Sequence, residues 1–153
     1  MRHPPSTSTT NQIVRLACRI NAEPTRVYDF FCDHESFGRI WPGTIKRIKD
    51  SDEPGNPNGL GSVRSIQLGP IVFEETHITC QRPQRIQYTV TRGGPIKNHL
   101  GTIDFIAEDD GTRIDYTISF DPRIPLTGCL IARSLKRDWE RGIQPIIAEL
   151  NRG

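Results

Sequence analysis

The sequence lacks several features that would assign it to a specialised class. No apolar run approaches the ~20 residues of a membrane-spanning helix. Residues 1–11 are rich in proline, serine and threonine and contain no apolar core, so a flexible tail is expected there rather than a secretory signal. A net charge of +2, with basic and acidic residues interspersed, does not indicate nucleic acid or a membrane surface as a partner.

The four cysteines are far apart in the sequence and form no CxxC pair. We therefore interpret them as small buried or half-buried side chains in a reducing cytoplasm, with a metal or disulfide role as the lesser alternative. The chain is expected to be cytoplasmic and to carry no metal and no cofactor. Its 153 residues suit one domain with one core, which we place at 12–151.

A long amphipathic helix is predicted over 127–151. Such a helix needs a large apolar surface to lie on, and because no other segment is a long helix, that surface must be a sheet. Gly142 and Pro145 lie inside the helix, and Pro145 has no N–H to donate, so a bend is expected between them. The apolar stripe recurs every three or four residues and consists of Ile131, Leu135, Trp139, Ile143, Ile146, Ile147 and Leu150.

Alternating or apolar patterns bounded by turn residues predict seven strands, and two short helices follow the first strand. Because no strand–helix–strand crossover occurs, the class is α+β: a curved seven-stranded antiparallel sheet wrapped on the long helix. A straight helix cannot touch every inner residue of a curled sheet, so a cavity is expected between them. The predicted strands are 13–20, 44–50, 62–68, 71–80, 85–92, 97–109 and 112–121.

The register of the last hairpin follows from its turn. If Asp110-Gly111 is a two-residue loop, Phe105 faces Tyr116 and the apolar residues of both strands share one face. His99 falls on this apolar face.

The order of elements resembles the helix-grip superfamily, which includes the birch pollen allergen family, START lipid-binding domains and the bacterial polyketide cyclase/dehydrase group (the SRPBCC proteins). The resemblance spans Ile13 to Leu150. It is carried by Glu23-Pro24-xx-Val27-Tyr28-Asp29-Phe30-Phe31, Phe37-xxx-Trp41-Pro42-Gly43, Asn58-Gly59-Leu60-Gly61-Ser62-Val63-Arg64, Pro83-xx-Ile86-Gln87-Tyr88, Gly93-Gly94-Pro95-Ile96 and Gly111-Thr112-Arg113-Ile114-Asp115-Tyr116.

The resemblance implies that Arg64 points into the cavity, with Glu74 and Thr76 as inward residues of the next strand. Alternation with Ile66 also turns Arg64 inward, where it needs an acidic partner or an anionic ligand, unless it reaches the cavity mouth. His99 is either a satisfied core histidine or a ligand-facing group, and His77 is expected to face outward. The predicted ligand-binding residues are Phe31, Phe37, Trp41, Arg64, Ile66, Glu74, Thr76, Tyr88, His99, Ile103, Tyr116, Leu135 and Trp139.

Three functions remain open, because members of this superfamily bind, carry, cyclise or regulate. The first is binding of a small lipid-, polyketide- or isoprenoid-like ligand, with an acidic or carbonyl oxygen for Arg64. The second is a cyclase/dehydratase-type enzyme that uses Arg64, Tyr88, His99 or Tyr116, although no catalytic set can be assigned by spacing. The third is a co-chaperone-like interaction module.

Overall fold

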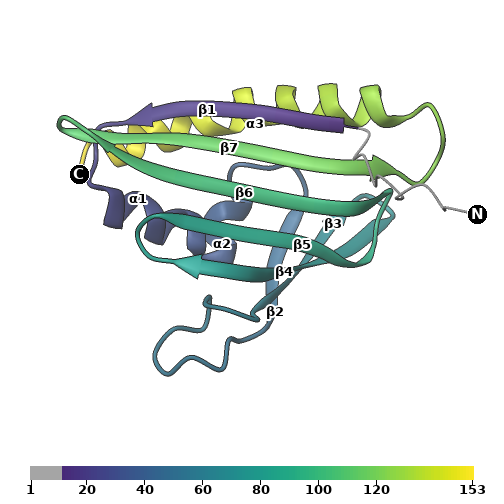
Figure 1. Ribbon diagram of the computed structural model, residues 1–153, viewed down its shortest axis with the longest axis horizontal. Coiled ribbons are helices and arrows are strands. Elements are labelled where there is room, and N and C mark those ends of the chain that lie inside the picture. Colours follow the sequence, from purple (N-terminus) through teal and green to yellow (C-terminus); the bar gives the residue numbers. More distant parts are fainter. Residues whose placement is uncertain (1–11) are drawn as a thin grey trace, which may run out of the picture.

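The computed structural model describes residues 12–153, so the tail predicted at 1–11 lies outside the described residues. The α+β prediction is confirmed: one seven-stranded antiparallel sheet, two short helices after the first strand and a long C-terminal helix (Figure 1). The elements are β1 Gln12–Ile20, α1 Pro24–Cys32, α2 His34–Gly38, β2 Thr44–Lys49, β3 Val63–Leu68, β4 Ile71–Gln81, β5 Arg85–Gly93, β6 Ile96–Glu108, β7 Gly111–Pro122 and α3 Gly128–Asn151.

Within the sheet the strands are ordered β1-β7-β6-β5-β4-β3-β2, so the β1–β7 pair joins strands distant in sequence and each other pair joins consecutive strands. In Figure 1, α3 runs along the β1 and β7 side, while α1 lies against β6 and β7 and α2 lies against the edge strand β2. The two short helices start from recognisable signals. Pro24 occupies the first turn of α1, where its missing N–H costs little, and the Asp33 carboxylate caps α2 by accepting from Ser36 N–H at 3.1 Å.

The long helix α3 is continuous through Pro145. The part that fills the core runs from the middle of the helix to its C-terminus, with Trp139, Ile143, Ile146 and Leu150 buried. Gly142 has a packing role, because a Cβ atom there would lie 1.7 Å from the carbonyl oxygen of Ile40. The absent side chain therefore lets α3 approach the segment after α2; the bend between Gly142 and Pro145 stays a prediction.

The predicted register of the β6–β7 hairpin is wrong by two residues. Phe105 faces Ile114 rather than Tyr116, and Ile103 faces Tyr116, because the turn is Asp109-Asp110. Gly111 belongs to β7, where a Cβ would lie 2.6 Å from the backbone oxygen of Ile20. An even-numbered shift preserves which face each side chain occupies, so His99 is on the inner face as expected.

The inner residues of β4 also differ from the expectation. Glu75 and His77 are buried, whereas Glu74 and Thr76 lie on the other face and are only half-buried. The assignments of Glu74 and Thr76 as inward and of His77 as outward are therefore wrong. The register of β4 against β5 shifts at two points, one of them between His77 and Thr79, so inward positions cannot be counted along the strand by simple alternation.

Candidate functional site

A cavity of about 100 Å³ lies between the inner face of the sheet and the first half of α3. We call it the sheet–helix cavity. It adjoins a groove of about 330 Å³ at the start of α3, and the two share Leu68, Phe73, Ile96, Leu135 and Asp138. Apolar side chains dominate the lining, and the polar groups are few. The remaining cavity-lining residues are Trp41, Pro42, Ile45, Ile66, Glu75, Tyr88, His99 and Ile118.

Beneath the polar end of this cavity, Arg64 and Glu75 form a buried ion pair. Arg64 Nε donates to Glu75 Oε1 at 2.8 Å, and the two side chains are 1% and 9% exposed. The guanidinium also lies between two aromatic rings, 4.3 Å from the centroid of Phe37 and 4.4 Å from that of Tyr88. Glu75 lines the cavity and Arg64 does not, so the cavity meets the carboxylate rather than the cation.

Two buried histidines complete the surroundings of Arg64. Its Nη1 lies 3.4 Å from His34 Nδ1 and 3.4 Å from His77 Nε2, and the two imidazole rings stack with centroids 4.2 Å apart. Because a guanidinium only donates hydrogen bonds, both nitrogens facing it act as acceptors. Burial, together with the nearby positive charge of Arg64, lowers the pKa of His34 to about 2, so this ring is neutral near pH 7.

His99 faces the same carboxylate from β6. Its Nδ1 accepts the backbone N–H of Val90 at 3.0 Å, which places the ring proton on Nε2, 4.0 Å from Glu75 Oε2. Burial lowers the pKa of His99, although Glu75 acts in the opposite direction. At the cavity wall there is thus one N–H donor and one carboxylate acceptor, too far apart to bond each other directly.

An aromatic cluster sets the inner limit of the cavity. The ring of Tyr88 covers Gly101, where a Cβ would lie 2.3 Å from the ring, so the glycine makes room for it. The Tyr88 and Tyr116 hydroxyls hydrogen-bond each other, and burial raises the pKa of both phenols. Tyr116 stacks on Trp139 with centroids 5.3 Å apart. The buried indole N–H of Trp41 has no hydrogen-bond partner among the described residues, although Trp41 lines the cavity.

The sequence-predicted residues divide into three groups. Trp41, Ile66, Tyr88, His99 and Leu135 line the cavity, and Arg64 lies beneath it. The second group is buried in the core and does not line the cavity: Phe31, Phe37, Ile103, Tyr116 and Trp139. Glu74 and Thr76 form the third, on the far face of β4. Sequence reasoning missed Glu75; the requirement that a buried Arg64 be paired was the available signal, but it was assigned to the neighbouring glutamate.

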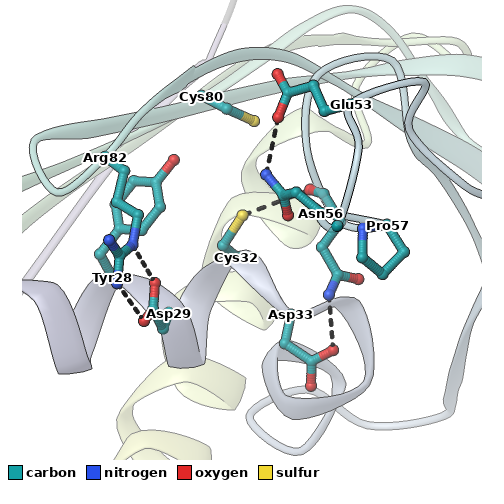
Figure 2. A pocket seen from close by; sticks show the side chains of 11 residues that line it. Tyr28, Asp29, Cys32, Asp33, Glu53, Asn56, Pro57, Cys80 and Arg82 are labelled. Carbon is teal, nitrogen blue, oxygen red and sulfur yellow. Dashed lines mark hydrogen bonds and ion pairs between the residues drawn. The ribbon is translucent and has the colours of Figure 1, made fainter.

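A second pocket, of about 490 Å³, lies outside the sheet–helix cavity, between α1, β4 and the loop before β3. We call it the thiol pocket because Cys32 and Cys80 line it (Figure 2). The two sulfur atoms and a ring nitrogen of His77 all lie within 4.8 Å of one another, a set of donor types that soft metals such as zinc use. Arg82 and Asp29 form a bidentate ion pair at its edge, with distances of 2.7 and 2.8 Å.

Comparisons with known proteins agree with this architecture. A family model described as "Polyketide cyclase / dehydrase and lipid transport" matches residues 11–151. A START superfamily protein from Mycobacterium smegmatis superposes with a TM-score of 0.72 at 11% identity, covering 92% of this chain and 97% of that one. A Thermobifida fusca protein solved by NMR gives 0.71 at 18% identity, covering 92% and 93%.

A protein from Thermus thermophilus gives a TM-score of 0.66 at 19% identity, covering 92% of this chain and 95% of that one. These likenesses concern the fold. A search of curated proteins finds no match. Among residues 12–153, no helix is both long and apolar enough to cross a membrane.

Proposed function

Because the chain belongs to the polyketide cyclase/dehydrase and lipid transport family, we propose that it binds a small apolar ligand carrying a hydroxyl group, in the sheet–helix cavity. One observation carries this proposal. The His99 Nε2–H donor and the Glu75 Oε2 acceptor lie 4.0 Å apart at the end of an apolar cavity. Apolar walls with a few convergent polar groups are typical of ligand sites.

The donor on His99 and the acceptor on Glu75, which we call the polar pair, determine which functional group of a ligand can bind between them. An oxygen placed about 2.8 Å from each atom spans the 4.0 Å gap, accepting from His99 and donating to Glu75. A hydroxyl does both, whereas a carbonyl only accepts and a carboxylate would face the carboxylate of Glu75. This replaces the expectation of an acidic or carbonyl oxygen on Arg64, because Glu75 already neutralises Arg64 and stands between it and the cavity.

The apolar part of the ligand would lie in the groove at the start of α3. The groove is bounded by Ile71, Leu130 and Ile131, and it continues from the cavity through Leu135. Ile71 and Leu130 are 43% and 65% exposed, so covering them with an apolar chain or ring would remove apolar surface from water. Lipid-, polyketide- and isoprenoid-like molecules that end in a hydroxyl meet these requirements.

A matched pair of probes tests the proposal: 2-naphthol against naphthalene, with binding followed by fluorescence. Naphthol is expected to bind about tenfold more tightly, the equivalent of about 1.4 kcal/mol, because only its hydroxyl can bridge the polar pair. The variant His99→Phe should erase the preference, whereas Glu74→Gln, on the other face of β4, should leave it unchanged. Equal binding of both probes to the unmodified protein would contradict the assignment of a hydroxyl ligand.

The arrangement of His99 and Glu75 supports a second candidate function, an enzyme of the cyclase/dehydratase type. A neutral His99 with its proton aimed toward a carboxylate, and with the Tyr88 ring 5.3 Å away, is an arrangement suited to proton transfer. If chemistry occurs, a bound hydroxylated substrate recovered after incubation should differ from the molecule added, as measured by mass spectrometry. Conversion that persists unchanged in His99→Ala would exclude this residue as the acid or base.

A further inference from the structure

The thiol pocket contains a pair of cysteines that the ligand site does not use. Cys32 is the last residue of α1 and Cys80 lies near the end of β4, and their sulfur atoms are within 4.8 Å of each other. Figure 2 shows both side chains directed toward the same space beside Tyr28. Cys18 lies on β1 and Cys129 on α3, and neither lines this pocket. The fold thus brings together two cysteines that α2, β2, β3 and most of β4 separate in the sequence.

The two ring nitrogens of His77 argue against a metal at this cluster. Nδ1 lies 2.8 Å from the Asn58 carbonyl oxygen, and Nε2 lies 3.4 Å from Arg64 Nη1. Since Arg64 can only donate, Nε2 accepts, and Nδ1 carries the proton toward the carbonyl. A metal on Nδ1 would leave the remaining N–H, on Nε2, facing a guanidinium instead of an acceptor, and a metal on Nε2 would have to take the place of that guanidinium.

The geometry instead suits chemistry between the two thiols. The thiol of Cys32 donates to the Asn58 carbonyl oxygen at 3.4 Å, and Tyr28 lines the same pocket as both cysteines. The neighbouring Cys32 lowers the pKa of Cys80, while Cys80 and burial raise the pKa of Cys32. Cys80 is half-buried and Cys32 is buried, so a small reagent entering the pocket meets Cys80 first as the better nucleophile.

We propose that Cys32 and Cys80 are a redox-active pair that a small hydroperoxide converts to an intramolecular disulfide. The Cys80 thiolate attacks the O–O bond, forming a sulfenic acid and releasing hydroxide or alkoxide, which takes up a proton. The Cys32 thiol then attacks the Cys80 sulfur, forming the S–S bond and releasing water. The two sulfurs together lose two electrons, and the peroxide gains them. A thiol reductant reverses the change.

The test uses the reduced whole chain and hydrogen peroxide as the probe. After treatment and alkylation, the intact mass should show two alkylated cysteines instead of four, and the remaining mass should be lower by two hydrogen atoms. Peptide mapping without reductant should recover a linked pair that contains Cys32 and Cys80, and the link should disappear with dithiothreitol. The double variant Cys18→Ser/Cys129→Ser is the matched control and should form the link at the same rate.

The order of attack is tested with single variants. In Cys32→Ser, Cys80 should accumulate as a sulfenic acid that dimedone traps, whereas Cys80→Ser should show little trapping at Cys32. Peptide maps of the unmodified protein that show both cysteines reduced, or a link that involves Cys18 or Cys129 in equal yield, would overturn the proposal. So would stoichiometric Zn²⁺ binding that protects both thiols, because the cluster would then be a metal site. None of these measurements depends on the ligand of the sheet–helix cavity.

Discussion

Removing the charge of Glu75 should destabilise the protein far more than removing that of its neighbour Glu74. In Glu75→Gln the Arg64 guanidinium stays 1% exposed but loses the carboxylate at 2.8 Å. Breaking a buried pair from one side typically costs about 3–5 kcal/mol, because a charge is left without compensation in a poorly solvated site. The two aromatic rings and two imidazole nitrogens around Arg64 remain, so the lower part of that range is expected.

Urea unfolding followed by circular dichroism measures this loss. For a domain of this size, about 3 kcal/mol corresponds to a fall in Tm of roughly 6–12 °C. Glu74→Gln is the matched control, and its effect should stay within about 0.5 kcal/mol, as for other surface changes. The double variant Arg64→Met/Glu75→Leu should recover most of the loss, since replacing both charges by apolar groups removes the desolvation cost. Equal shifts for the two single glutamine variants would refute the argument that Glu75 compensates Arg64.

Three further predictions concern other buried contacts. Because the folded-state pKa of His34, about 2, lies below its unfolded value of about 6.5, only the unfolded chain takes up this proton as pH falls below 6.5. Stability should therefore decrease by up to about 1.4 kcal/mol per pH unit below pH 6 in urea titrations, and His34→Gln should remove that part of the slope. Gly142→Ala normally stabilises a helix by about 1 kcal/mol, but here it should lower Tm, because the methyl group meets the Ile40 carbonyl; a rise in Tm would contradict the close approach. Tyr88→Phe should cost about 1–3 kcal/mol by leaving the Tyr116 hydroxyl unpaired, and the double Phe variant should cost less than the sum of the two single changes in urea unfolding.

The fold was accessible from sequence because its signals are periodic and local. The apolar stripe of α3, the Pro24 and Asp33 helix starts and the alternation of β7 each depend on neighbours within a few residues. The inward position of Arg64 followed from its alternation with Ile66 in the same way.

Details that depend on contacts between distant segments could not be obtained in this way. The turn at Asp109-Asp110 is set by the approach of Gly111 to the backbone of Ile20, which no local pattern contains. The choice of Glu75 over Glu74 depends on the register shifts of β4 against β5. The meeting of Cys32 with Cys80 depends on where α1 ends relative to β4, so spacing in the sequence gave no sign of it.

The register shift of β4 between His77 and Thr79 also indicates where the chain can lose a residue without disturbing the sheet. Two consecutive residues there, Ile78 and Thr79, lie between the inward positions of His77 and Cys80. A chain lacking Ile78 would keep strict alternation, so every other side chain of β4 would retain its face. It would lose only the local bend that a bulge gives a strand. The loss of a single residue among relatives is therefore expected at this position, where it would alter the distance between Cys32 and Cys80 and leave Arg64 with its carboxylate.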